Sequence, residues 1–199
     1  MPAERLAGSS ALEMDSFPPW ERPSRSVVTI GLFDGVHLGH RALLKALKQW
    51  AKEEKALSVV LTFDKHPLRV LTGQGPPLID APLFKVALLR SLGIDRVWLL
   101  RISREVLSLK ARDFLIRFVT TKLNAVGLLV GFNNVIGSDR ADLKKLENEG
   151  RELSLKVMTS KPVFFQGRPI SSTMVRDCLL YTSDAADEGL GVDLGGRRI

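Results

Sequence analysis

The sequence predicts an α/β fold in which a parallel, five-stranded sheet carries helices on both faces. Strand-like and helix-like segments alternate five times along the chain, and this alternation is typical of parallel strands joined by crossover helices. The strand-like segments are short, continuous apolar runs rich in β-branched residues, as expected for strands buried on both faces. A chain of 199 residues suffices for one domain with short appendages.

Each element follows from its local pattern. In the first helix, apolar residues recur every three or four positions, and lysines and glutamates occupy the other face. A loop rich in glycine and proline is expected at residues 73–77. The expected strands are residues 26–33, 57–63, 95–102, 125–132 and 153–165. The expected helices are residues 40–55, 82–94, 111–123, 139–152 and 171–180.

Composition excludes several classes of protein. A hydrophobic content of 45% with 26% charged residues is ordinary for a globular protein. No apolar run approaches eighteen residues, and the stretch before residue 26 lacks the apolar core of a signal peptide. We therefore expect a cytoplasmic protein with no membrane partner. The formal net charge of +7 indicates an anionic partner without identifying it.

The first strand-to-helix loop, GLFDGVHLGH at residues 31–40, has the properties of an anion site. Its glycines allow a tight turn and close approach of the backbone to a ligand. The helix that follows presents free N–H groups and the positive end of its dipole. His37 and His40 are three residues apart, so both can point the same way and donate to phosphate oxygens. The alternative is a glycine-rich turn with two surface histidines.

The pattern GxFDGVHxGH resembles the phosphate-binding motif of the nucleotidyltransferase superfamily. More narrowly, it is similar to the FMN adenylyltransferase (FAD synthetase) module of bacterial bifunctional riboflavin kinase/FAD synthetases. The resemblance implies a Rossmann-like HxGH nucleotidyltransferase fold. Three further stretches, in the family's order and spacing, carry the resemblance across residues 26–177.

The stretch TFDKHP, which ends the second expected strand, resembles the family's T-F-(E/D)-P-H-P. The resemblance implies that Phe63, His66 and Pro67 bind FMN. Lys65 stands where the family usually has proline. Without the resemblance, His66-Pro67 is a simple strand-ending turn.

The stretch VGFNNVIGSDR resembles the family's V-G-x-(D/N)-F-x-F-G-x-x-R. Asn133, Gly137 and Arg140 match, which implies that they bind FMN. Asn134 and Ile136 stand where aromatic residues are usual, so stacking area for the flavin is lost. A polar turn followed by a helix start is the alternative interpretation.

The stretch ISSTMVR resembles the family's ISSTxIR and opens the last expected helix. Its hydroxyls and backbone N–H groups can cap the helix and bind phosphate, and the guanidinium of Arg176 can hold phosphate oxygens. By the resemblance, the catalytic residues are His37, His40 and Arg176. The implied ATP-binding residues are Gly31, Phe33, Asp34, Gly39, Ser171, Ser172 and Thr173.

The implied reaction transfers AMP from ATP to the phosphate of FMN and gives FAD and pyrophosphate. Mg²⁺ is expected to bind through phosphate oxygens, with no certain protein ligand. Asp34 either contacts the metal or ribose or stabilises its own turn. Two alternatives remain: a related nucleotidyltransferase with another phosphate acceptor, and a non-catalytic flavin- or nucleotide-binding protein. No nucleic-acid partner is expected, because no basic stripe is interleaved with aromatic residues.

The ends of the chain differ in character from its middle. Residues 1–25 are expected to be a polar lead-in, and residues 26–177 the nucleotidyltransferase domain. In residues 178–199, the run CLLYTSDAADE resembles a conceptual translation through a sequencing adapter, so this tail is expected to be artefactual. A genuine C-terminus is the alternative. The family normally continues into a riboflavin kinase domain, which is expected in the full-length protein and absent here.

Overall fold

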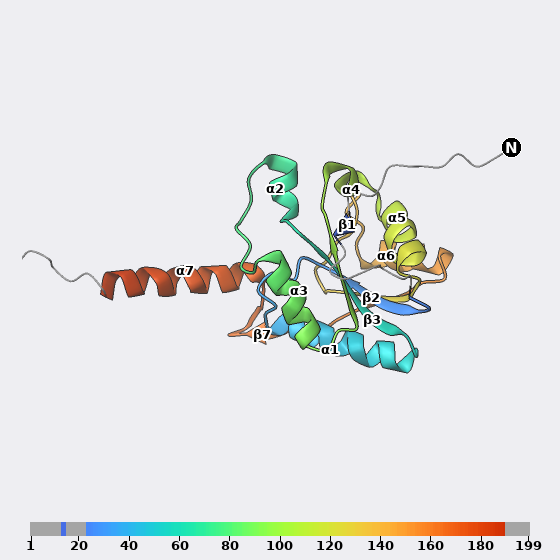
Figure 1. Ribbon diagram of the computed structural model, residues 1–199, viewed down its shortest axis with the longest axis horizontal. Helices are drawn as coiled ribbons and strands as arrows, with labels where there is room; N and C mark the ends of the chain where they lie inside the picture. The colour runs from blue at the N-terminus through green and yellow to red at the C-terminus, as the bar shows by residue number, and fades with distance from the viewer. Residues whose placement is uncertain (1–12, 15–22, 190–199) are drawn as a thin grey trace, which may run out of the picture.

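A twisted central sheet organises this protein, whose computed structural model describes residues 13–14 and 23–189. Figure 1 follows the chain through the sheet and the helices around it. The strands are β1 (Glu13–Met14), β2 (Ser26–Ile30), β3 (Leu57–Phe63), β4 (Arg96–Leu100), β5 (Ala125–Val130), β6 (Lys156–Thr159), β7 (Phe164–Phe165) and β8 (Arg168–Pro169). The helices are α1 (Leu38–Glu53), α2 (Pro67–Thr72), α3 (Pro82–Ser91), α4 (Arg104–Ser108), α5 (Ala111–Phe114), the π-helix η1 (Leu115–Lys122), α6 (Leu143–Glu152) and α7 (Ser172–Gly189).

The strand order of the sheet is β1-β4-β3-β2-β5-β6. Strands β2 to β6 are all parallel to their neighbours, which confirms the predicted five-stranded parallel sheet. The chain moves outward from β2 in one direction through β3 and β4, and in the other through β5 and β6. The carboxyl ends of β2 and β5 therefore lie at the point where the strand order reverses, where open parallel sheets bind ligands.

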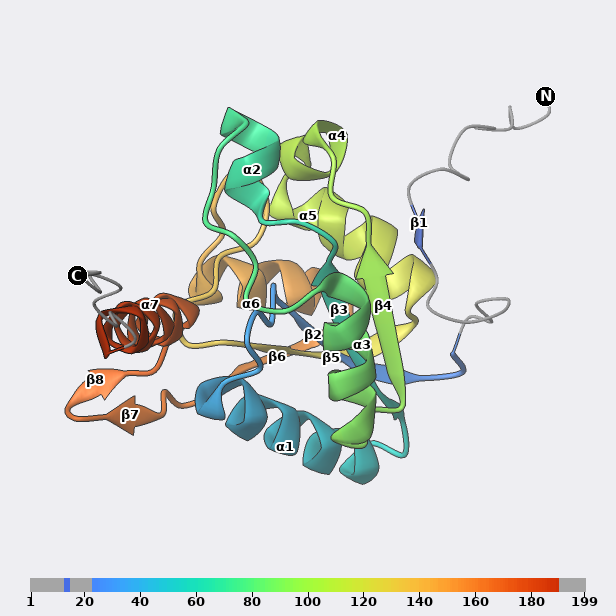
Figure 2. The ribbon, with the colours of Figure 1, turned by 60° about the vertical axis from the view of Figure 1, so that its left-hand side comes forward.

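Helices cover both faces of the sheet, as Figure 2 shows, and an apolar cluster lies under them on each face. On one face, α1 and α3 pack on the strands through side chains such as Leu47 and Leu89. On the other face, α5, η1 and α6 pack through side chains that include Phe118 and Leu146. Neighbouring residues of β2 go to opposite layers, and all five of its residues are buried. This burial explains why the strand is a continuous apolar run.

Several details differ from the sequence-based expectation. The lead-in supplies the short edge strand β1, antiparallel to β4, and its other residues before position 23 lie outside the described part of the chain. Strand β2 ends at Ile30, earlier than expected, because the following loop turns through Phe33, whose φ is +52°. The segment expected as one strand at 153–165 divides into β6 and half of the hairpin β7–β8.

The final helix begins within the ISSTMVR stretch and continues without a break past residue 177, the boundary expected from the sequence. Residues 190–199 of the expected tail lie outside the described part of the chain. No helix among the described residues is long and apolar enough to cross a membrane.

Candidate active site

A cavity of about 230 Å³ opens at the carboxyl ends of β2 and β5. The loop after β2, the loop after β5 and the start of α7 surround it. Of the residues predicted to bind ATP or act in catalysis, seven line this cavity: Gly31, Phe33, His37, Gly39, His40, Ser171 and Ser172. The structure thus brings together two motifs that are more than 130 residues apart in the sequence.

The two histidines form one unit at the start of α1. His37 is the N-cap of the helix, and its Nδ1 accepts a hydrogen bond from the backbone N–H of His40 at 3.3 Å. The two rings stack with their centroids 3.7 Å apart. Since Nδ1 of His37 is an acceptor, a neutral His37 carries its proton on Nε2. His37 can therefore donate one hydrogen bond into the cavity.

Burial keeps both imidazoles neutral. It lowers the pKa of His40 to about 3, helped by the charges of His37 and Lys85. Burial also lowers the pKa of His37, although Asp34 opposes the change. Nδ1 of His40 is buried without a hydrogen-bond partner among the described residues. At neutral pH the pair can therefore contact an anion through polar ring atoms rather than through full positive charges.

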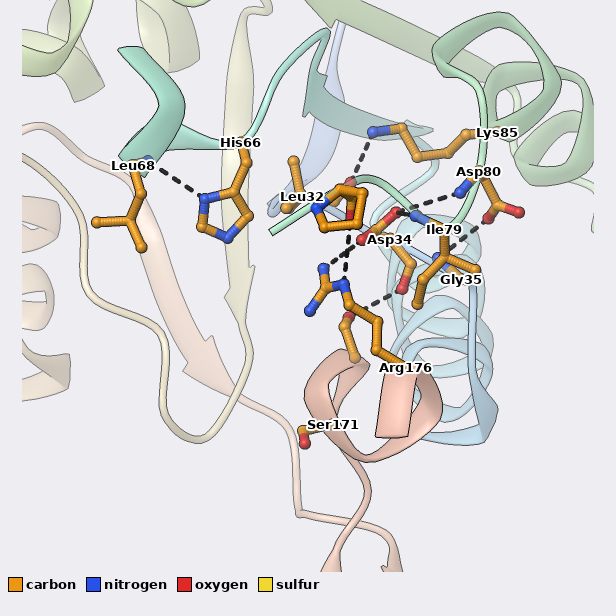
Figure 3. A network of polar contacts seen from close by, with 12 residues as sticks. Leu32, Asp34, Gly35, His66, Leu68, Ile79, Asp80, Lys85, Ser171 and Arg176 are labelled. Carbon is orange, nitrogen blue, oxygen red and sulfur yellow. Dashed lines mark hydrogen bonds and ion pairs between the residues drawn. The ribbon is translucent and has the colours of Figure 1, made fainter. Parts of the chain in front are cut away.

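A second cavity, of about 490 Å³, lies between the ends of β2 and β3 and the segments around α2 and α4. Its walls are mostly apolar. Five of the residues predicted to bind FMN line it: Phe63, His66, Pro67, Gly137 and Arg140. The sixth, Asn133, lines the first cavity instead. His66 caps α2 by accepting a hydrogen bond from the N–H of Leu68 at 3.2 Å (Figure 3), and burial is the largest cause of its lowered pKa.

The two cavities share a wall made of Ile30, Gly31, Leu32 and Asn134. The side-chain amide of Asn134 donates to the carbonyl of Ile30 at 2.7 Å and so ties the loop after β5 to the end of β2. Ile136, in contrast, is buried in the core, and its backbone pairs with Ala141. Asn134 and Ile136, which stand where the family usually has aromatic residues, therefore both make contacts that stabilise the structure.

Three predicted residues do not line either cavity: Asp34, Thr173 and Arg176. Asp34 is fully buried and accepts hydrogen bonds from the backbone N–H groups of Ile79 at 2.8 Å and Asp80 at 3.3 Å. Its other carboxylate oxygen pairs with Arg176 (Figure 3). Asp34 thus makes the loop-stabilising contacts that were one of its two expected roles.

The start of α7 is attached to the loop after β2. The hydroxyl of Ser172 donates to the backbone carbonyl of Asp34 at 2.9 Å. The hydroxyl of Ser171 accepts from the N–H of Met174 at 3.3 Å, as a capping residue does. These two contacts hold the first turn of α7 beside the first cavity.

Lys85 is a residue that the sequence motifs do not single out. It lies on α3, its side chain is fully buried, and its Nζ donates to the carbonyls of Leu32 and Phe63. The only sequence signal is its position on the apolar face of the expected helix, four residues before Leu89. Because lysine side chains are almost always exposed, the sequence alone predicts an exposed side chain here.

Among the described residues, no group of three or more histidine, cysteine, aspartate or glutamate side chains could hold a metal ion. The polar groups of the first cavity are mainly hydroxyls, imidazoles, side-chain amides and backbone groups.

Comparison with known proteins places these features in a family. Residues 20–174 match the FAD synthetase family. The chain is 35% identical to the bifunctional riboflavin kinase/FMN adenylyltransferase of Pseudomonas fluorescens, over 86% of this chain and 54% of that protein. It is 32% identical to the protein of the same name from Escherichia coli (strain K12), over 82% of this chain and 53% of that protein.

The chain thus spans about half the length of the curated relatives it matches. Among solved structures, it resembles one described as the crystal structure of a macrolide-efflux protein from Streptococcus pneumoniae. That match has a TM-score of 0.74 and 30% identity, and it covers 81% of this chain and 54% of the other. Together with the HxGH loop, the twin cavities and the parallel sheet, the match across residues 20–174 shows that this chain belongs to the FAD synthetase family.

Proposed function

We propose that this chain transfers AMP from ATP to the phosphate of FMN, giving FAD and pyrophosphate. The observation that carries the proposal is the pair of cavities with a common wall at the end of β2. The first cavity is lined partly by imidazole, hydroxyl and backbone groups that can bind an anion, and the second mostly by apolar side chains, which suits a nucleoside triphosphate and a flavin ring respectively. The names of the relatives support the same reaction.

In this proposal, the first cavity holds the phosphates of ATP. Nε2 of His37 donates to a phosphate oxygen, and His40 lies beside it as a neutral imidazole. Ser171 adds a hydroxyl donor and the start of α7 adds backbone N–H groups, because the hydroxyl of Ser172 already donates to the carbonyl of Asp34. A phosphate oxygen of FMN attacks the α-phosphorus of ATP, and the bond from that phosphorus to the pyrophosphate oxygen breaks. Positioning and charge stabilisation supply most of the rate acceleration.

The second cavity holds the flavin in this proposal. Phe63 and Pro67 provide apolar contact, and the exposed Arg140 supplies positive charge at the cavity's edge. The wall formed by Gly31 and Asn134 lies between the two substrates. We propose that the phosphate of FMN crosses this wall to reach ATP.

We also propose Mg²⁺ as the accompanying cation. The imidazole and hydroxyl groups that line the first cavity suit phosphate oxygens, so phosphate oxygens rather than a protein cage would hold the ion. When bound, Mg²⁺ supplies neutralisation of the charge that develops on the phosphates.

The experiment is to incubate the purified chain with ATP, FMN and Mg²⁺ and to measure FAD by HPLC. A parallel panel replaces FMN by nicotinamide mononucleotide, phosphopantetheine or glycerol 3-phosphate. FAD formation that exceeds every other product by at least tenfold is the expected result. A preference for another acceptor contradicts the flavin assignment, and binding of ATP and FMN without any product favours the non-catalytic alternative.

Two properties of the natural protein complete the proposal. We propose a cytoplasmic location, in keeping with chemistry that consumes ATP. We also propose a riboflavin kinase domain in the full-length protein, supported by the greater length of the relatives. Sequencing the source DNA beyond the codon for Asp177 tests the second point, and a reading frame that retains residues 178–199 contradicts it.

A further inference from the structure

Lys85 is a buried cation at the edge of the candidate site. Its side chain has 0% exposure, although lysine is among the residues least often buried. Nζ donates to the carbonyl of Leu32 at 2.8 Å (Figure 3) and to the carbonyl of Phe63 at 2.9 Å. A single ammonium group therefore joins the chain just after β2 to the last residue of β3.

The two carbonyls belong to the walls of the candidate cavities. Leu32 lines both cavities, and Phe63 lines the second. The hydroxyl of Thr62 donates to the same Leu32 carbonyl at 2.9 Å, so this oxygen accepts two hydrogen bonds. Lys85 itself lines neither cavity. Any effect it has on bound substrates must therefore pass through the backbone that it holds.

Burying the ammonium group of Lys85 costs desolvation free energy. The presence of a lysine at this position therefore needs an explanation other than stability. Desolvation lowers the pKa of Lys85 to about 8, while the carboxylates of Asp34, Asp80 and Asp64 oppose the change. An apolar side chain of similar length would fill the same space without that cost, but the carbonyl of Phe63 would lose this donor and that of Leu32 would keep only Thr62. We therefore expect the ammonium group of Lys85 to fix the positions of the backbone at Leu32 and Phe63.

We propose that Lys85 is a positioning residue: it holds the backbone at Leu32 and Phe63 so that the nucleotide and flavin cavities keep their common wall. This inference rests on the proposed function for its effect on catalysis. It concerns a residue outside all four motifs that carry the family resemblance.

Three variants test the proposal. Lys85→Met keeps the length of the side chain and removes the donors, and Lys85→Gln restores an uncharged donor. The matched control is Lys48→Met, because Nζ of Lys48 also donates to a backbone carbonyl, that of Leu92 at 2.8 Å, but on the exposed surface away from both cavities. Melting temperatures report whether each variant is folded.

The first measurement is steady-state FAD formation with separate kcat and KM values for ATP and FMN. Lys85→Met is expected to lower kcat/KM for both substrates at least tenfold, Lys85→Gln is expected to recover part of this loss, and Lys48→Met is expected to match the wild type. The proposal is overturned if folded Lys85→Met protein keeps both kcat/KM values within twofold. If Lys85→Met does not fold, Lys85→Gln decides on the same criterion, with a threefold loss expected.

The second measurement needs no turnover. Hydrogen–deuterium exchange of the ligand-free protein is compared over residues 30–36 and 62–66. Faster exchange at both segments in the Lys85 variants, with unchanged exchange elsewhere in the sheet, is expected. Unchanged exchange at both segments contradicts the proposal that Lys85 holds the backbone there. A wild-type protein that forms no FAD overturns the proposed function. The exchange comparison still tests whether Lys85 positions the backbone, because it does not depend on turnover.

Discussion

The carboxylate of Asp34 meets the guanidinium of Arg176 at 2.5 Å, across 142 residues of sequence. The Asp34 side chain is fully buried, and that of Arg176 is 15% exposed. Nε of Arg176 also donates to the carbonyl of Pro77 at 3.1 Å. The pair therefore connects the loop after β2, the segment before α3 and the first turns of α7. It also keeps Arg176, which the sequence predicts to bind phosphate, outside the lining of the first cavity.

Breaking this ion pair should destabilise the fold. Asp34→Asn leaves Arg176 without its buried anionic partner, and because Arg176 is partly exposed we expect the free energy of unfolding to fall by about 3 kcal/mol. Urea denaturation measures the change. The matched control is Glu152→Gln, which removes one exposed partner of Arg112 and should have no measurable effect. Equal effects of the two variants contradict the structural role, and a double-mutant cycle with Arg176→Gln isolates the pair.

Removal of the His40 imidazole should impair catalysis. We expect His40→Ala to lower the rate of FAD formation at least tenfold with the fold intact, because a group adjoining the phosphates is lost. The control is Gln49→Ala, at an exposed position of the same helix, where the side-chain amide donates to the carboxylate of Glu53 at 2.8 Å. FAD formation by HPLC and circular dichroism are the measurements. An unchanged rate in folded His40→Ala protein refutes the role of His40.

Acid should destabilise the protein through its partly buried histidines. The pKa of His40 is about 3 in the folded state and near 6.5 in the unfolded chain. Between these pH values the unfolded chain binds a proton that the folded state excludes, so stability falls as pH decreases below about 6.5. The contribution of His40 has a slope of up to about 1.4 kcal/mol per pH unit.

Urea denaturation at several pH values between 7.5 and 4.5 checks this prediction, with His40→Gln as the comparison. The variant should lose less stability than the wild type over this range. The lowered pKa values of His37 and His66 act in the same direction and remain in both proteins. Parallel pH profiles for the two proteins show that His40 is not the origin of the acid sensitivity.

Gly137 should be irreplaceable in the loop that lines the second cavity. Its φ is +80°, and an added Cβ would lie 2.2 Å from the backbone nitrogen of Ala111. Gly137→Ala should therefore lower the melting temperature and weaken FMN binding, measured by quenching of flavin fluorescence. Gly167→Ala is the control, since φ is +77° there but no atom lies within 4 Å of the new Cβ. If the two variants are equally affected, the left-handed backbone and not the close packing is responsible.

The site residues differ in how far local sequence determines them. The start of α1, with its adjacent histidines and glycines, follows from a ten-residue motif, because all the interacting groups lie within one turn of helix. The contact of Asn134 with Ile30 and the burial of Lys85 depend on segments that are distant in the sequence. The sequence places Lys85 on the apolar face of its helix, but no local pattern shows which backbone carbonyls its ammonium group contacts.

The sequence by itself determined the five parallel strands, the strand-to-helix loops that carry the motifs, and the family, because apolar periodicity and short motifs are local properties of the chain. Tertiary structure alone decided which groups meet: Arg176 with Asp34, Lys85 with two strand ends, and one wall between two cavities. The physical reason is that these contacts depend on how the strands are ordered in the sheet. Only that order brings residues from opposite parts of the chain within hydrogen-bonding distance.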